Sequence, residues 1–255
     1  MYRGFNLRVE PEFFRAYVED GVTSHQEHTA IARVGLGSFK DSSGKIMGSK
    51  VYANWFPQID ANVFISHAHK DSDLAIGLSG FLKYEFGISS FIDSCVWGYS
   101  GDLQKALDEA YCLSEDGKTY SYSKRNRSTA HVHMMLSVAL SNMINNCECI
   151  IFLNTPQSIV PAKYIEDNAT ESPWIFAEIA MTQIIQWRSR SAHRKILEKA
   201  AESFVADSAV PIEYDVNLDH FTDLNAGSMQ TWRERFKGYS AYDALDILYR
   251  LPASQ

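Results

Sequence analysis

The sequence is poor in the residues that mark unusual classes of protein. It has only 4 cysteines, 7 prolines and 14 glycines among 255 residues. So few cysteines exclude a disulfide-rich scaffold, and so little proline and glycine exclude collagen-like and low-complexity chains. With 45% apolar and 22% charged residues, the composition is that of an ordinary globular protein. A chain of this length can bury a sizeable core.

Positive charge and long apolar runs are also scarce. The formal net charge is −7, so the chain lacks the basic field that draws proteins to nucleic acids or anionic lipids. No apolar run approaches the roughly 20 residues that span a bilayer, and no signal-peptide core follows the N-terminus. We therefore expect a cytoplasmic protein with no nucleic-acid partner and no membrane segment.

The four cysteines fit a reducing compartment. Cys147 and Cys149 flank a single residue, which is too close for an easy bridge and unlike the paired spacing of a zinc site. We interpret both, together with Cys95 and Cys112, as reduced structural thiols.

The chain divides into an extension and one larger domain, and it contains no internal repeat. Residues 1–60 are predicted to form an N-terminal helical extension packed on the core, with a helical pattern over 11–34 that Gly21 weakens. Residues 61–251 are predicted to form the main domain. A polar stretch within it, from Ser114 to Ser128, predicts an insertion loop at about 111–130.

From residue 62 onward, apolar runs typical of strands alternate with amphipathic helical patterns. The predicted strands are 63–65, 88–92, 149–153 and 210–216. The predicted helices are 74–82, 103–110, 132–144, 173–187 and 241–251. This alternation predicts an α/β fold with a parallel sheet covered on both faces. Such sheets bind ligands beyond the carboxyl ends of their strands, so the loops after Ile65, Ile92 and Leu153 are candidate sites.

The first of these loops, Ser66-His67-Ala68-His69-Lys70-Asp71, allows two interpretations. His-x-His-x-Asp after an apolar strand is most of the metallo-β-lactamase zinc signature, with His131 or His133 and His220 as possible later ligands. The next residue of that signature is a histidine, however, and here it is Ser72. The alternative is a polar loop in which Asp71 or Ser72 caps the following helix.

The second loop, 94–101, places Trp97 and Tyr99 among glycines and serines. Exposed aromatic residues in such a loop suit a mobile lid over a flat ligand such as a nucleobase. The alternative, equally favoured by the sequence, is that Trp97 packs the loop against the core.

The third element is the start of a helix, with Ser172 as the predicted N-cap and Pro173 in the first turn. Trp174 and Glu178 follow one turn apart on the same face. A carboxylate beside a tryptophan on a largely apolar face needs a partner or a task. The alternative is that Glu178 is half-exposed at the helix edge and Trp174 belongs to the core.

Taken together, these pieces resemble the Toll/interleukin-1 receptor (TIR) domain family, and in particular its bacterial members. The matching residues are Val63-Phe64-Ile65-Ser66-His67 with Asp71, Phe91-Ile92-Asp93 followed by Trp97 and Gly101, and Cys149 to Leu153 leading to Ser172-Pro173-Trp174 with Glu178. The resemblance covers residues 61–190 well and the tail to 251 weakly. The extension at 1–60 and the insertion at 111–130 depart from a minimal TIR domain.

The resemblance implies a flavodoxin-like fold with a five-stranded parallel sheet. It also implies cleavage of NAD+ at the nicotinamide–ribose bond, with NAD+ as substrate and with no cofactor or metal. The catalytic glutamate of the family corresponds to Glu178 in this chain. The resemblance places the following residues around the substrate: Ser66, His67, His69, Asp71, Asp93, Trp97 and Trp174.

One ionised glutamate can both stabilise the positive charge that develops on the ribose and bind its hydroxyls. Water as acceptor gives ADP-ribose, whereas an atom of the same ADP-ribose gives a cyclic signal molecule. The resemblance further implies self-association through TIR surfaces. The resemblance also makes this chain a candidate member of a Thoeris-type bacterial antiphage system. In such a system the TIR enzyme makes a messenger that diffuses to a separate effector protein. Two alternatives stay open: a TIR interaction module without turnover, and a metal-dependent hydrolase that uses the His-x-His-x-Asp loop.

Overall fold

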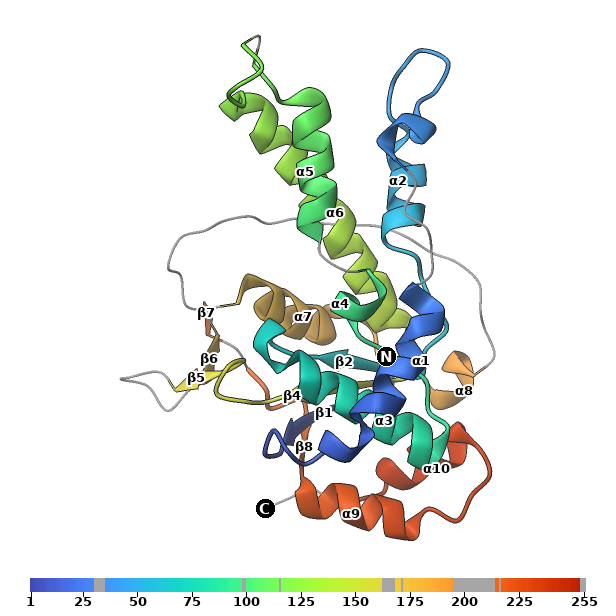
Figure 1. Cartoon of the computed structure of the whole chain (residues 1–255). Coiled ribbons are helices and arrows are strands. Elements are labelled where there is room, and N and C mark those ends of the chain that lie inside the picture. The colour runs from blue at the N-terminus through green and yellow to red at the C-terminus, as the bar shows by residue number, and fades with distance from the viewer. Residues whose placement is uncertain are drawn as a thin grey trace.

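The computed structural model describes residues 1–29, 35–97, 100–114, 116–161, 168–170, 172–194, 214–215 and 217–252. Helices cover both faces of a five-stranded, all-parallel sheet (Figure 1). The predicted α/β fold class is confirmed, and the arrangement is consistent with a flavodoxin-like fold. The strands of this sheet are β1 (Arg3–Arg8), β2 (Val63–Ser66), β3 (Ser90–Phe91), β4 (Cys149–Leu153) and β8 (Thr222–Asn225).

The apolar strands predicted at 63–65 and 149–153 form the middle of the sheet, whose order is β3-β2-β4-β1-β8. Val63 and Ile65 of β2 point into the core on one face, whereas Phe64 points into the core on the other. Because both faces are buried, these strands need no alternation of polar and apolar residues.

The first strand corrects the prediction that residues 1–60 form a helical extension. β1 pairs with β4 on one side and with β8 on the other, so the start of the chain is an inner strand of the sheet. Phe5 and Leu7 are fully buried, and the buried amide of Asn6 donates to Asp223 at 2.6 Å. Only two large apolar residues interrupted by a polar one mark this strand, so the sequence pattern did not reveal it.

The remainder of the N-terminal region is largely helical. It contains η1 (Arg15–Tyr17), α1 (Val18–Thr29), η2 (Leu36–Phe39) and α2 (Gly48–Trp55). The helix predicted over 11–34 is found as η1 and α1, and residues 30–34 of that prediction lie outside the described residues.

The late strand predicted at 210–216 is also corrected. Of that range the structure describes only 214 and 215, which form β7 (Tyr214–Asp215). β7 pairs antiparallel with β6 (Asn168–Thr170), which pairs with β5 (Val160–Pro161), in a separate three-stranded sheet. The main sheet ends instead with β8, whose sequence Thr-Asp-Leu-Asn contains a single apolar residue, as an edge strand can.

Two layers of helices enclose the sheet (Figure 1). On one face lie α3 (Ser72–Phe86), α9 (Ala226–Arg235) and α10 (Ala241–Leu248), whose buried residues share a core with β1, β2 and β4. On the other face lie α6 (Tyr122–Asn146) and α7 (Pro173–Ile184). The shorter helical elements are η3 (His69–Asp71), α4 (Asp93–Val96) and α8 (Arg190–His193).

The helix α1 packs directly against α3, and glycines line the contact. A Cβ atom at Gly21 would collide with the backbone of Ile76, and one at Gly80 would collide with the backbone of Tyr17. Gly21, which the sequence pattern marked as a weak point of a helix, therefore allows two helices to approach closely.

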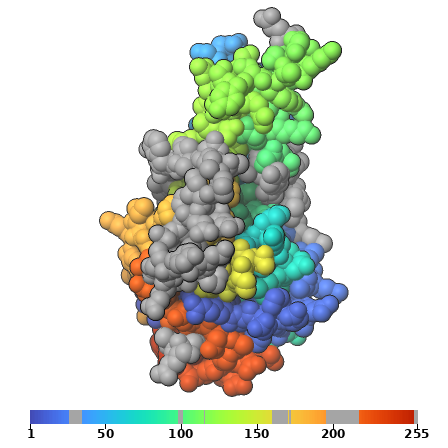
Figure 2. All heavy atoms as spheres, turned by 90° about the vertical axis from the view of Figure 1, so that its left-hand side faces the viewer, coloured from blue at the N-terminus to red at the C-terminus, as the bar shows by residue number. Residues whose placement is uncertain are grey.

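The helix α5 (Ser100–Tyr111) and the first turns of α6 form a hairpin that projects from the rest of the molecule (Figures 1 and 2). The insertion predicted at 111–130 is not a loop throughout, because α6 already begins at Tyr122. The connection between the helices is closed by a bridge between Leu113 and Tyr120. The first turns of α6 are mostly solvent-exposed, so their polar residues show no helical periodicity.

In the described ranges, no helix combines the length and apolar character needed to cross a membrane. All four cysteines are free thiols, as predicted. Burial raises the pKa of Cys95 to about 11 and that of Cys147 to about 12. Both are therefore protonated and unreactive at neutral pH.

Candidate active site

A cavity of about 430 Å³ lies at the carboxyl end of the sheet, within the range of about 300–1,000 Å³ that is typical of small-molecule sites. The chain passes from β2 outward to β3 and then returns to β4 on the other side of β2. Ligands bind at such a reversal of strand order. The cavity is lined by His67, His69, Asp93, Ser94, Trp97, Leu136, Leu140, Ser172, Trp174, Ile175 and Glu178.

The helix α7 places Glu178 in this cavity. As predicted, Ser172 is the N-cap and accepts a hydrogen bond from the backbone amide of Ile175 at 3.3 Å, and Pro173 follows in the first turn. Glu178 lies one turn beyond Trp174, and its side chain is only 6% exposed. The alternative of a half-exposed glutamate at the helix edge is therefore wrong.

The carboxylate of Glu178 has a buried partner at the end of β2. The hydroxyl of Ser66 donates to Glu178 Oε2 at 2.5 Å. Burial and, to a smaller extent, the nearby charge of Asp93 together raise the pKa of Glu178 to about 8, although the hydrogen bond from Ser66 acts in the opposite direction. The cavity therefore holds a carboxyl group that changes its charge near neutral pH.

Two further polar groups come from the loops after β2 and β3. Burial lowers the pKa of His67, an effect that the nearby Asp93 opposes, so this imidazole is neutral at pH 7. Its buried Nε2 has no hydrogen-bond partner among the described residues. The carboxylate of Asp93 accepts a hydrogen bond from the backbone amide of Ser94 at 2.7 Å, which fixes it at the start of α4. Asp93, His67 and His69 all line the cavity.

For Trp97 the structure favours packing over a mobile lid. The side chain is 2% exposed, and its Nε1 donates to the carbonyl of Pro57 at 2.9 Å. Its ring meets Phe56 and Phe91 edge to face. Trp97 is therefore a fixed part of the cavity wall, whereas residues 98 and 99 of the predicted lid lie outside the described residues.

Trp174 lines the cavity and is half-buried. Its ring meets the imidazole of His133 edge to face, with 5.4 Å between ring centroids. The side chain also packs against the core to which α6 contributes. Core packing and a place in the cavity wall are therefore both found for this residue.

Asp71 does not line the cavity. Its carboxylate accepts a hydrogen bond from the hydroxyl of Thr155 at 2.5 Å, which ties the loop after β2 to the loop after β4. The predicted capping of α3 by the side chain of Asp71 or Ser72 is not found. The hydroxyl of Ser72 donates instead to the carbonyl of His69.

The metal interpretation of the His-x-His-x-Asp loop finds no ligand set in the structure. Within the described part of the chain, no three histidine, cysteine, aspartate or glutamate side chains gather as metal ligands. Asp71 faces Thr155, and His220 bonds to Thr182 at 2.8 Å on another part of α7. The loop thus contributes His67 and His69 to the cavity without a third ligand.

Several residues of the cavity wall were not predicted. Leu136 and Leu140 of α6 were recognised only as the apolar face of a helix, and a sequence pattern does not distinguish a wall of a cavity from a filled core. Ile175 of α7 is likewise an apolar helical residue whose place in the cavity wall no sequence pattern indicates. Ser94, by contrast, follows directly after a predicted strand, so its position could have suggested it.

Comparisons with known proteins found no relative of this chain. A scan against models of protein families, a search of curated proteins and a search of solved structures each found no match to this chain. The TIR resemblance therefore rests on the residues that carry it.

Proposed function

We propose that this protein cleaves the nicotinamide–ribose bond of NAD+, with Glu178 as the catalytic carboxylate. The observation that carries the proposal is a buried glutamate, bonded to Ser66 and close to Asp93, in a cavity at the reversal of strand order. The TIR resemblance supports the choice of NAD+ as substrate. The polar groups of the cavity support a substrate with both charged and hydroxyl-bearing parts.

In the proposed reaction, the bond between ribose C1′ and the pyridinium nitrogen breaks and its electron pair stays with the nitrogen. Nicotinamide leaves as a neutral molecule, so no strong general acid is needed. The ribose acquires oxocarbenium character, which the negative charge of Glu178 stabilises. Water then bonds to C1′ and loses a proton, giving ADP-ribose, or an atom of the same ADP-ribose closes a cyclic product.

The proposal requires Glu178 to be ionised when the bond breaks. Burial holds its pKa at about 8 in the free protein, and the positive pyridinium of NAD+ favours the charged carboxylate. Because kcat/KM reports the ionisation of the free enzyme, we expect kcat/KM to rise with pH and to level off above about 8.

The other polar residues have supporting roles in this proposal. Ser66 holds the carboxylate of Glu178 in one orientation through its hydrogen bond. His67, whose Nε2 has no partner among the described residues, is a donor or acceptor for the substrate. Asp93, which raises the pKa of Glu178 in the free protein, is a second carboxylate of the cavity and binds substrate hydroxyls. Trp97 and Trp174 supply flat walls for the nicotinamide ring.

We place this activity in the cytoplasm, in a bacterial antiphage system in which the product is a diffusible messenger for a separate effector. Self-association through TIR surfaces is part of the same proposal. The alternative, an interaction module without turnover, predicts that signalling survives Glu178→Gln.

The proposal is tested by incubating the pure protein with NAD+ at several protein concentrations and separating the products by chromatography. We expect wild type to release nicotinamide with ADP-ribose or a cyclic product, and Glu178→Ala to release neither. Equal consumption of NAD+ by both proteins would contradict the role of Glu178. Absence of consumption at every concentration would favour the interaction module.

A further inference from the structure

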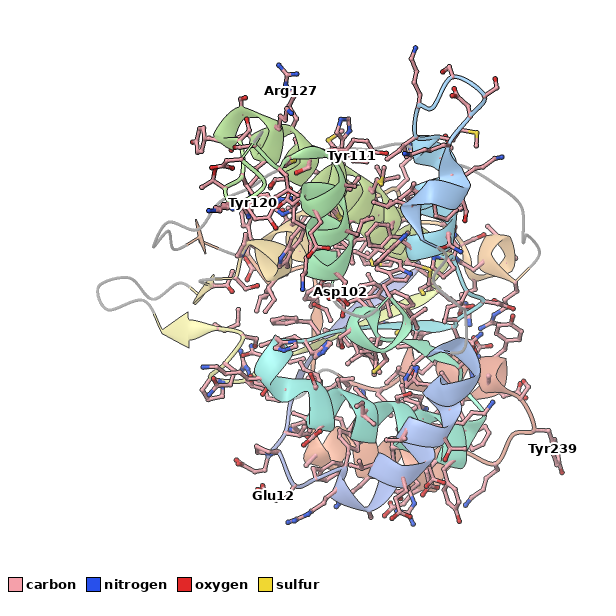
Figure 3. The ribbon with its side chains drawn as sticks, turned by 45° about the horizontal axis from the view of Figure 1, so that its top comes forward. Glu12, Asp102, Tyr111, Tyr120, Arg127 and Tyr239 are labelled. Atoms are coloured by element: carbon pink, nitrogen blue, oxygen red, sulfur yellow. The ribbon has the colours of Figure 1, made fainter. Side chains whose placement is uncertain are left out.

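A second cavity, of about 340 Å³, lies at the outer end of the molecule between α2, α5 and α6. Figure 3 shows Tyr111 and Arg127 at this end. No residue lines both this cavity and the one that contains Glu178. The lining residues are Ile46, Gly48, Val51, Leu107, Tyr111, Cys112, Lys124, Arg127, Ser128, His131 and Met135.

The lining combines an apolar interior with a basic rim. The apolar part comes from all three helical segments and includes Val51, Leu107 and Met135. The basic side chains, Lys124, Arg127 and His131, all come from α6 and are exposed. Their spacing of three and four residues places them along one face of the helix.

One acidic group of the hairpin, Asp108, is already paired within the hairpin. Asp108 is buried and accepts hydrogen bonds from Arg125 at 2.9 Å and from Ser128 at 2.5 Å. The carboxylate of Asp108 is therefore neutralised by Arg125. Neither Lys124 nor Arg127 forms an ion pair with a described residue.

A further cation adds to the rim from the other side. Lys40 Nζ lies over the ring of Tyr111, 5.6 Å from its centroid. The lining itself contains no aspartate or glutamate. The chain as a whole has a net charge of −7. Positive side chains at the rim of an apolar cavity nevertheless create a local positive potential, which favours binding of an anion there.

We propose that this cavity binds a small amphiphilic anion. Its apolar body occupies the space between Val51, Leu107 and Met135. Its carboxylate, sulfonate or phosphate group lies against Lys124 and Arg127. The volume is within the range of about 300–1,000 Å³ for small-molecule sites, and this site is independent of the proposed reaction at Glu178.

The test uses 8-anilinonaphthalene-1-sulfonate, whose fluorescence rises on binding, and the uncharged N-phenyl-1-naphthylamine, which has the same aromatic body. We expect the double variant Lys124→Glu/Arg127→Glu to weaken binding of the sulfonate at least tenfold and that of the uncharged probe less than twofold. Leu107→Trp, which fills the cavity, should weaken both probes. Arg235→Glu, an exposed charge reversal on α9, should affect neither.

An unchanged affinity for the sulfonate in the double variant would overturn the proposal, as would an equal loss of both probes. Thermal unfolding of each variant confirms that it is folded. Competition with the bound sulfonate then identifies the class of ligand: displacement by decanoate indicates an aliphatic anion, and displacement by naphthalene-2-sulfonate an aromatic one. Displacement by neither would also contradict the assignment.

Discussion

Glu178 lies in a cavity whose walls include Leu136, Leu140 and Ile175, where an ionised carboxylate is unfavourable without compensation. Its hydrogen bond with Ser66 supplies part of that compensation. The protein therefore keeps a carboxyl group in a place that stability alone does not explain, as functional sites commonly do.

The positions of some candidate site residues could be predicted because they follow from neighbours close in the sequence. Others could not, because they depend on residues far away along the chain. The pairing of Trp174 with Glu178 follows from helical spacing, and the position of His67 follows from the end of an apolar strand. The orientation of the Asp71 side chain, by contrast, depends on its hydrogen bond with Thr155, which lies 84 positions away in the sequence. No local pattern contains that information.

The burial of Glu178 predicts a stability effect that does not depend on any function. Because its pKa is raised from 4.5 to about 8 in the folded protein, the folded state holds a proton that the unfolded state has already released between these pH values. The free energy of unfolding therefore falls as pH rises through this window. Glu178→Gln removes the effect.

The quantity to compare is the Tm of Glu178→Gln minus the Tm of wild type at the same pH. We expect this difference to be more positive at pH 9 than at pH 6 by at least about 3 °C, which corresponds to about 1 kcal/mol for a chain of this size. Thermal unfolding followed by circular dichroism measures it. The exposed Glu234→Gln serves as control and should show no such trend. A difference independent of pH would contradict the burial of this carboxyl group.

At the scale of elements, the contact between α1 and α3 depends on glycines that let two backbones approach. The sequence predicts both helices but marks Gly21 only as a weak point, because a single glycine looks the same whether it weakens a helix or permits a close crossing. Similarly, the sequence predicts a loop where the first turns of α6 lie. Their polar residues are largely solvent-exposed on the projecting hairpin and carry no apolar stripe.

Gly80→Ala should destabilise the protein by about 1–3 kcal/mol or more, because its new Cβ would collide with the backbone of Tyr17 and force the helices apart. Gly37→Ala is the matched control, since nothing lies within 4 Å of a Cβ at that position. Urea denaturation of the two variants measures the difference. Equal stabilities would show that α1 does not pack on α3 in this way.

At the scale of the whole molecule, the N-terminal strand decides how the sheet is built. The alternation of strands and helices was sufficient to predict a parallel sheet and the edge at which a site would lie. It was insufficient to find β1 and β8, because β1 alternates large apolar residues with Gly4 and Asn6 and β8 is mostly polar. Both strands are defined by their partners in the sheet rather than by their own composition.

The inner position of β1, between β4 and β8, predicts that its apolar residues are essential to the fold. Leu7→Ala should lower the free energy of unfolding by about 2–5 kcal/mol, because Leu7 is fully buried between β4 and β8. Leu113→Ala, at a position that is 40% exposed, is the control and should change stability by less than about 1 kcal/mol. If Leu7→Ala leaves the free energy of unfolding unchanged, the N-terminal segment is not an inner strand of the sheet and is better described as an extension.

The most direct test of the account is the rate of nicotinamide release from NAD+ at pH 8.5 by wild type, Glu178→Gln and Glu234→Gln. Glutamine keeps the shape of the side chain and its contact with Ser66 but removes the charge. We predict that Glu178→Gln is slower than wild type by at least about 10²-fold, while Glu234→Gln matches wild type. A Glu178→Gln protein that is folded and releases nicotinamide at the wild-type rate would contradict the assignment of Glu178 as the catalytic carboxylate.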